Sequence, residues 1–276
     1  MNAIENLEIS GAKIYFYIRN VPLFGDVPIT EAQVNSWIVI VLVAILCKVL
    51  THGMKVRPAG KRQIIAEFIV EKATNFVKGN MGDKFEPFAP FIAALMALSA
   101  FSSLLSIFGM YSPTADLNTI AGWAIVVFVM ITYYKLKGGL GGYLKGFTQP
   151  IFVLTPFNII SELATPISMM FRHFGNICSG SVIMTLVYAA LSVLSAAVFR
   201  WLPGALAQFP FFQIGIPVVF SMYFDIFGAL LQAFIFAMLT MMYISSAAED
   251  GEAARAERLE KKEKRKQKRL AKQKQM

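Results

Sequence analysis

The chain contains 276 residues, of which 56% are hydrophobic and only 16% are charged. This composition excludes an ordinary water-soluble domain and is typical of a polytopic membrane protein. Several apolar stretches reach the length of about 20 residues that a helix needs to cross a hydrocarbon core roughly 30 Å thick. Cys47 and Cys178 lie in separate apolar stretches, with the spacing of neither a disulfide framework nor a metal site. We therefore expect an all-α membrane protein without a cofactor or a bound metal.

The first span is predicted at Val34–Leu50, after an N-terminal segment, residues 1–30, that carries more acids than bases. Met1–Arg19 has acids where a secretory signal is basic, so we expect no cleavage there. A basic stretch from Lys48 to Arg62 follows the span, and basic loops remain in the cytoplasm. The N-terminus is therefore expected outside. At Gln63–Lys78, apolar and charged residues recur at helical spacing, which predicts an amphipathic helix lying at the cytoplasmic interface.

Four more apolar spans follow along the chain. They are Phe88–Phe108, Ile120–Tyr134, Pro156–Phe199 and Pro217–Ser246. The third would extend about 65 Å as one helix, twice the membrane thickness, so it must be strongly tilted or lie along the membrane. Charge assigns the loops Gly109–Thr119 and Arg200–Gly215 to the outside and the Gly- and Lys-rich loop Lys135–Gly146 to the inside. The sequence thus predicts about five crossings, with the N-terminus outside and the C-terminus in the cytoplasm.

The chain ends in a basic tail of low complexity, residues 249–276, which follows the membrane domain at 31–248. Between Glu249 and Lys274 the tail holds eleven Lys or Arg and six Asp or Glu, and it has no aromatic residue. Such a segment cannot bury a core, so we expect a solvated helix or a disordered segment in the cytoplasm. We favour a tail that sets membrane topology over one that binds nucleic acid, and anionic lipid headgroups are its hypothetical partner.

Arg172 lies in the middle of the third of these spans, far in sequence from any other base. A charge at the centre of a membrane helix costs on the order of 2.5 to 3.5 kcal/mol on insertion scales and usually has a function. Polar residues recur around it at steps of three and four, on one face of the helix. They are Asn158, Ser161, Thr165, Ser168, Arg172, Asn176 and Ser179. Two alternatives stay open: an arginine that pairs with a neighbouring helix, and a polar face that joins helices.

The last span repeats the pattern with Ser221, Asp225, Gln232 and Tyr243 on one face. If the two polar faces meet, they line a path for ions between the helices, although a structural ion pair between Asp225 and Arg172 is an alternative. An arginine stays protonated and cannot pass protons on. Relay therefore falls to titratable groups. The candidates are Asp225, Glu162 near the cytoplasmic end, Asp116 at the outer mouth, and His173, which lies off the polar face and is better explained as a packing residue.

These residues stand in segments that resemble subunit a of the F-type ATP synthase, the membrane stator beside the rotating c-ring. The resemblance covers about Thr30 to Glu249 and is carried by PISMMFRHFGN around Arg172. Three further segments support it in the same order as in the family: PTADLN, PFNIISELA and LQAFIFAMLTMMYIS. Each segment is modest alone, but together they are specific.

The resemblance implies that Arg172 sits between two aqueous half-channels, faces the carboxylate of each passing c subunit and blocks direct leak. It implies that Asn176 and Gln232 match polar residues near that arginine. It also implies that Asp225 matches an acid or His of the outer half-channel. A long tilted helix pair is expected to face the c-ring. Ser168 and Tyr243 are further candidates for the pathway. The implied partners are the c-ring, the peripheral-stalk subunit b, other ATP synthase subunits and membrane lipids, and not nucleic acid. The implied role is non-catalytic ion translocation in a bacterial inner membrane.

The sequence departs from the family pattern RLFGNxxxGE at two positions. His173 stands in place of the leucine and Ser181 in place of the glutamate. The acid of the outer half-channel is therefore expected at Asp225 alone. The translocated ion, proton or sodium, is left open. A secondary transporter and a purely structural membrane protein are the two competing classes of function.

Overall fold

The computed structural model describes residues 11–22, 25–56, 60–148, 151–201, 211–213 and 215–274. An antiparallel hairpin of strands β1 (Ile14–Val21) and β2 (Gly25–Thr30) comes first, and helices make up nearly all the rest. The helices are α1 (Glu31–Thr51), α2 (Lys61–Met81), α3 (Ala89–Leu104), α4 (Leu117–Leu136), α5 (Leu140–Phe147), α6 (Thr155–Val198), α7 (Ile216–Ser221) and α8 (Gly228–Lys274). The all-α membrane fold is confirmed, with the hairpin as an element that was not predicted.

Within the described residues, five helical segments are long and apolar enough to cross a membrane. They are Glu31–Thr51, Asp83–Phe108, Leu117–Leu136, Phe152–Val198 and Val219–Lys264. Each contains or overlaps one predicted span. The predicted amphipathic helix forms as α2 and is not among the five, in keeping with a position at the membrane surface. The predicted outer loop Arg200–Gly215 lies mostly outside the described residues.

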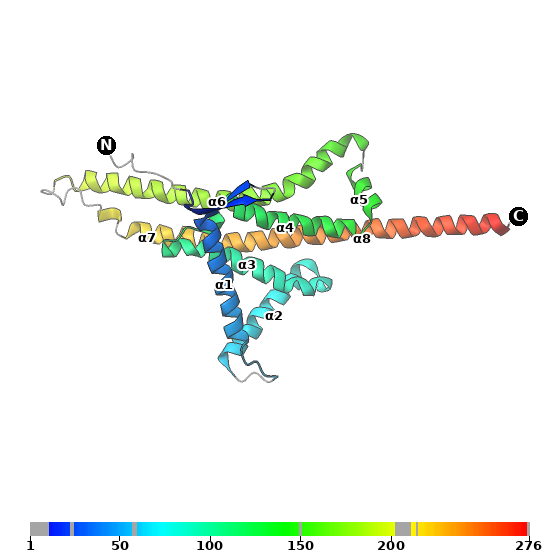
Figure 1. Ribbon diagram of the computed structural model, residues 1–276, viewed down its shortest axis with the longest axis horizontal. Coiled ribbons are helices and arrows are strands. Elements are labelled where there is room, and N and C mark those ends of the chain that lie inside the picture. The colour runs from blue at the N-terminus through cyan, green and yellow to red at the C-terminus, as the bar shows by residue number, and fades with distance from the viewer. Residues whose placement is uncertain are drawn as a thin grey trace.

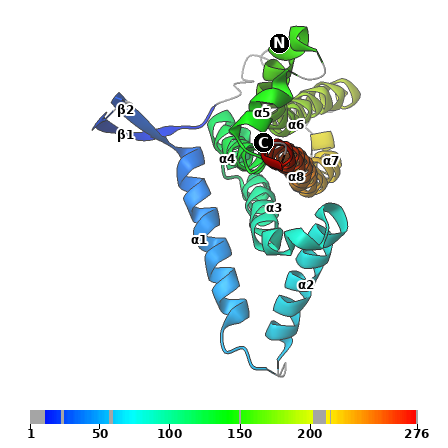
Figure 2. The ribbon, with the colours of Figure 1, turned by 90° about the vertical axis from the view of Figure 1, so that its right-hand side faces the viewer.

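The helices run in two directions. Helices α3, α4, α6 and α8 pack along one another and follow the long axis of the molecule, whereas α1 lies across them (Figure 1). From the far end of α1 the chain returns through α2 to the start of α3, so that α1 and α2 form an open V (Figure 2). If α1 crosses the bilayer along the membrane normal, the packed helices must be strongly tilted away from that normal. The length of α6 requires the same, because its 44 residues extend about 66 Å.

Helix α6 continues through Pro166, Gly175 and Gly180 without a break, but it bends in its first half (Figure 1). Pro166 has no backbone N–H, so the carbonyl of Glu162 loses its partner in the helical ladder. A proline at this position is the usual cause of a kink. The bend directs the start of α6 away from α8.

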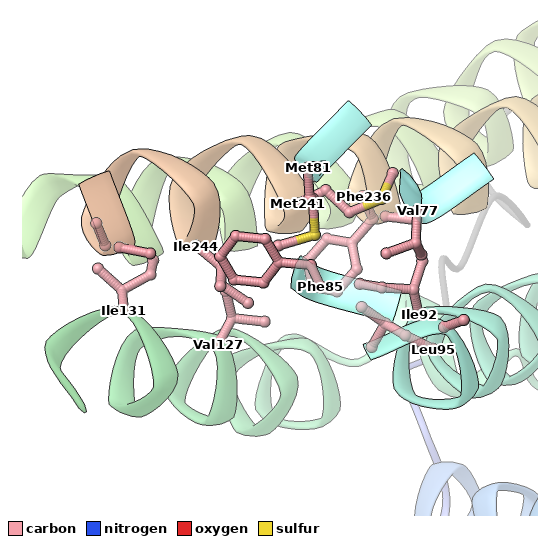
Figure 3. Close-up of a cluster of buried hydrophobic side chains, with 14 of the residues drawn as sticks. Val77, Met81, Phe85, Ile92, Leu95, Val127, Ile131, Phe236, Met241 and Ile244 are labelled. Carbon is pink, nitrogen blue, oxygen red and sulfur yellow. The ribbon is translucent and has the colours of Figure 1, made fainter. Parts of the chain in front are cut away.

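The hydrophobic core lies where α2, α3, α4 and α8 meet. Val77, Ile92, Val127 and Phe236, one from each of these helices, are at most 1% exposed, and Phe85 of the short helix Asp83–Phe88 packs among them (Figure 3). Of α6, only Met169 belongs to this cluster. Helix α6 is therefore held along one edge of the core, and its opposite face is exposed.

Helix α8 continues far beyond the bundle as the basic tail, which is helical to Lys274 (Figure 1). At the edge of the bundle it crosses the end of α4 at glycines: a Cβ on Gly138 would lie 2.7 Å from the carbonyl oxygen of Gly251, and one on Gly251 would collide with the carbonyl oxygen of Tyr134. Contact this close requires that neither glycine carries a side chain. The end of α4 thereby fixes where the tail leaves the bundle.

Candidate ion-pathway site around Arg172

Arg172 points away from the core. Its side chain is exposed on α6, and it makes no hydrogen bond or ion pair with any residue that the structure describes. Ser168 and Asn176, one turn before and after it, are exposed on the same face. The alternative of an ion pair between Arg172 and Asp225 is therefore not what the structure contains. A charged group in the membrane without a partner in its own chain needs one from another molecule or from water.

His173 fixes this orientation of the helix. Its ring is fully buried and meets two aromatic rings edge to face, with centroid distances of 6.1 Å to Trp123 and 5.2 Å to Phe236. Neither ring nitrogen has a hydrogen-bond partner among the described residues. Because successive helical residues are turned by about 100°, burial of His173 against α4 and α8 keeps Arg172 on the outer surface. The structure thus places His173 as a packing residue.

Helices α6 and α8 are joined one turn beyond Arg172. The side-chain amide of Asn176 donates to Oε1 of Gln232 over 3.2 Å, and Gln232 is only 2% exposed. The two predicted polar faces therefore meet at this pair of residues. Elsewhere on the polar face of α6, Ser161, Ser168 and Ser179 are exposed, and Asn158 and Thr165 are partly exposed.

One cavity opens on the N-terminal side of Arg172, between α4, α5, α6 and α8. We name it the Glu162 cavity; it holds about 580 Å³ and is lined by Asn158, Ser161, Glu162 and Thr165 of α6, Lys135 of α4 and Asp250 of α8 among others. Oε2 of Glu162 lies 2.5 Å from Nζ of Lys135, and its Oε1 is buried without a partner among the described residues. A smaller cavity of about 80 Å³ adjoins it and adds Tyr243 to the lining. Glu162 is thus a largely buried carboxylate that a lysine of α4 holds through one of its two oxygens.

A second cavity lies on the C-terminal side of Arg172, between α6, α8 and the loop after α3. We name it the Asp225 cavity; it also holds about 580 Å³, and Ser103, Tyr111, Ser112, Asn176, Ser181 and Asp225 are among its lining residues. Asp225 is the only charged side chain among the described residues that line it. The carboxylate oxygen Oδ2 accepts a hydrogen bond of 2.5 Å from the hydroxyl of Ser221.

The two cavities do not meet. Along α6, Thr165 is the last residue that lines the Glu162 cavity and Phe174 is the first that lines the Asp225 cavity, a separation of about 14 Å at 1.5 Å per residue. Arg172 lies in the interval, with the buried His173 and Met169 behind it. The arrangement consists of two cavities on one helix, each with an acid in its lining, separated by a packed segment whose outer surface carries an arginine without a partner among the described residues.

The sequence as a whole matches a known membrane-protein family. The family model described as ATP synthase A chain covers residues 33–245. ATP synthase subunit a of Desulforamulus reducens is 32% identical over 221 residues, which is 79% of each chain. This chain belongs to the ATP synthase subunit a family.

Other members are similarly related. ATP synthase subunit a 2 of a Bradyrhizobium strain is 30% identical over 225 residues, or 81% of this chain and 91% of the relative. ATP synthase subunit a, sodium ion specific, of Propionigenium modestum is 34% identical over 142 residues, which are 51% of this chain and 42% of that protein. The family includes a sodium-specific member, so membership alone does not fix the ion.

Asp225 of this subunit a family member stands on a local irregularity of the helix. Residues Met222–Phe227 form a turn of π-helix between α7 and α8. Such turns inside α-helices are rare and often occur at functional sites. The hydrophobic pattern of the sequence gives no sign of the widened turn. It moves Asp225 from the position that a regular helix would give it.

Three predicted pathway residues lie apart from Asp225. Asp116 caps α4, where its Oδ1 accepts from the backbone N–H of Asn118 over 3.1 Å, and it is not among the residues lining either cavity. Ser168 is on the exposed face of α6 outside both cavities. Tyr243 lines the smaller cavity together with Glu162 and does not line the Asp225 cavity. Sequence reasoning missed Lys135 and Tyr111, because a lysine at a helix end and a tyrosine in a loop carry no pattern of their own.

Proposed function

We propose that this chain is the non-catalytic stator subunit of an ATP synthase membrane sector, and that its two cavities are half-channels carrying ions to and from the carboxylates of a c-ring. Ions enter the ring through one cavity, travel with the ring and leave through the other. The ring would pass the exposed face of α6, and the bend of α6 and the tilt proposed for α6 and α8 suit a surface that follows a rotor.

A single observation carries this proposal: the two cavities flank Arg172 without meeting, and Arg172 has no partner among the described residues. A secondary transporter needs one binding site that opens in turn to each side of the membrane. Two separate cavities instead suit an ion that leaves this chain at one cavity, is carried by another molecule and returns to this chain at the other cavity. The guanidinium stays charged and cannot relay a proton. As a fixed cation it favours the ionised form of a carboxylate that faces it and repels cations that would pass directly from one cavity to the other.

Charge supports the assignment of sides. The Glu162 cavity lies beside the Gly- and Lys-rich loop and the basic tail, which the distribution of bases places in the cytoplasm. The Asp225 cavity would then open outside, the N-terminal segment would lie outside and the C-terminus inside. An ion that crosses between them under 100 mV releases about 2.3 kcal/mol for rotation.

The remaining partners follow from this role. Subunit b and other ATP synthase subunits would hold the chain beside the ring, and lipids of a bacterial cell membrane would surround it. The translocated ion is a proton or sodium, since a sodium-specific relative exists and the c-ring carries the site that binds the ion. Asn176 and Gln232 would hold α6 against α8 next to the arginine.

The test is Arg172→Ala in the assembled complex, with Arg62→Ala on the exposed surface of α2 as the matched control. In inverted membrane vesicles we expect normal assembly of the variant but complete loss of ATP-driven ion pumping, and a passive ion leak above that of the control. Both effects come from removing the one fixed charge between the cavities. Pumping by Arg172→Ala at the control rate would overturn the proposed function.

A further inference from the structure

The N-terminal hairpin exposes an unusual amount of apolar surface. In β1, five consecutive residues, Ile14–Ile18, are each between 47% and 56% exposed, and three of them are aromatic. The hairpin extends from the start of α1 on the side away from the helical bundle (Figure 2). A two-stranded hairpin alone is marginally stable in water at best. Another surface must therefore cover it.

Strand pairing sorts these side chains onto two different faces. Phe16 is opposite Ile29 and Ile18 is opposite Val27, so one face is formed by aliphatic and phenyl groups. Tyr17 is opposite Pro28 on the other face, and the alternation is regular from Phe16 to Ile18, between two register shifts of the ladder. Over these three residues one face is therefore purely apolar, and the other carries the ring of Tyr17.

The root of the hairpin is firmly attached to the first membrane helix. Strand β2 ends at Thr30 and α1 begins at Glu31, whose backbone N–H donates to the carbonyl of Lys13 over 2.8 Å. Ile29 is only 4% exposed. With no linker between them, the direction of α1 sets the direction of the hairpin. The hairpin lies across the end of α1 (Figure 2).

A hairpin that lies across the end of a membrane-crossing helix lies parallel to the membrane surface at that end. The exposed apolar side chains of α1, among them Trp37, Ile38 and Val41, begin within two turns of the hairpin and belong in the bilayer, so the lipid surface continues from α1 to the hairpin. Tyrosine rings favour this level, where one end is apolar and the other meets water. The unpaired edges of both strands need water or headgroups as partners, which excludes the hydrocarbon centre.

We propose that the hairpin is a lateral membrane anchor that lies in the interface of the bilayer, with Phe16 and Ile18 in the acyl region and Tyr17 among the headgroups. The partner is the lipid surface itself. The anchor braces α1 on the side away from the bundle, where no other described element supports it. This inference depends on the membrane fold and not on the route of the ions.

The test uses single cysteines at residues 15, 16, 17 and 18 of the full chain with Cys47 and Cys178 replaced by alanine, in the assembled complex in lipid nanodiscs. A nitroxide attached to each cysteine reports collision with oxygen, which concentrates in lipid, and with a water-soluble nickel chelate. Labels at Val41 in α1 and Lys266 in the tail give the lipid and water references, because both side chains are exposed in the structure. We expect the labels at positions 16 and 18 to have the same oxygen and nickel accessibility as the label at position 41, and the label at position 17 to be several-fold more accessible to nickel.

Two results would overturn the proposal. If nickel reaches all four positions as it reaches position 266, the hairpin lies in water. If both reagents are excluded from all four, a protein covers the hairpin in place of lipid. Neither result affects the ion-pumping test of Arg172→Ala, so the failure of one proposal is distinguishable from the failure of the other.

Discussion

The two cavities beside Arg172 have the same volume, about 580 Å³, but they differ in chemistry. The Glu162 cavity contains charges of both signs, and its acid is paired with Lys135. The Asp225 cavity combines hydroxyl groups with apolar side chains, and its single carboxylate is hydrogen-bonded to a serine. In the Glu162 cavity, Glu162 and Glu257 are therefore each paired with a lysine of the same chain, whereas the carboxylate of the Asp225 cavity has no cation beside it among the described lining residues.

If both cavities carry ions as proposed, this difference predicts that they depend on their acids to different degrees. In the Glu162 cavity, Asp250 and Glu257 also line the wall, so several groups are able to exchange ions with water. In the Asp225 cavity, loss of one side chain removes every described charge. We expect substitutions to be severe on the Asp225 side, intermediate at the Lys135–Glu162 pair and weak at the rim of the Glu162 cavity.

The largest effect is expected for Asp225→Asn. A positioned acid–base group typically contributes about 10²–10⁴-fold to proton transfer. We expect ATP-driven pumping and passive flux through the membrane sector to fall by about tenfold or more, with normal assembly because the amide fits the same space. Asp116→Asn is the matched control: it keeps a side chain that can cap α4, and we expect flux within about twofold of the unmodified complex. Equal flux in the Asp225 and Asp116 variants would remove the contrast between the cavities.

A smaller gain is expected when an acid is placed elsewhere in the Asp225 cavity. Ser181 lines this cavity and stands where the pattern RLFGNxxxGE, which the sequence resembles, has glutamate. If the cavity needs one carboxylate and not a particular residue, Ser181→Glu added to Asp225→Asn should restore several-fold of the lost flux. Ser179→Glu, two residues away on the exposed face of α6 and not among the residues lining the cavity, is the control and should restore none. Equal rescue by both would mean that charge near α6 matters and the cavity does not.

Sequence reasoning predicted the helices well, because long apolar runs and basic loops directly reflect the bilayer. It also found Arg172 and its polar face, since a charge inside an apolar run is visible in the sequence. The contacts that fix the outward direction of Arg172 could not be predicted, because His173 is buried against Trp123 and Phe236, which come from other helices. The π-helical turn at Asp225 depends in the same way on tertiary packing. The hairpin had a local signal in IYFYI, a run of aromatic and β-branched residues typical of strands.

An intermediate effect is expected at the Lys135–Glu162 pair, whose side chains are 24% and 14% exposed. Lys135→Gln leaves the carboxylate without its cation, and breaking a buried pair from one side costs up to about 3–5 kcal/mol, with less expected here because the cavity is open. We expect lower thermal stability of the complex and a flux reduced a few-fold. The double variant Lys135→Gln with Glu162→Gln leaves no unpaired charge and should be more stable than Lys135→Gln alone. A double variant less stable than both single variants would show that the pair does not act as a charge pair.

The smallest effect is expected at the rim of the same cavity, where Nζ of Lys145 lies 2.8 Å from Oε1 of Glu257 and both side chains are 46% exposed. The hydrogen bond to Glu257 raises the pKa of Lys145 above its usual 10.5. A raised pKa of a lysine adds stability below its unfolded value, and this contribution is lost only as the pH rises through the higher folded value. The pair therefore stays charged across the neutral range, so its titration should add no pH dependence to the pumping rate between about pH 6 and 9. We expect Lys145→Gln to leave flux unchanged at any salt concentration, while Lys135→Gln lowers it in the same assay. If the rim substitution reduced flux as much as the inner one, the Glu162 cavity would depend on its total charge and not on the single inner pair.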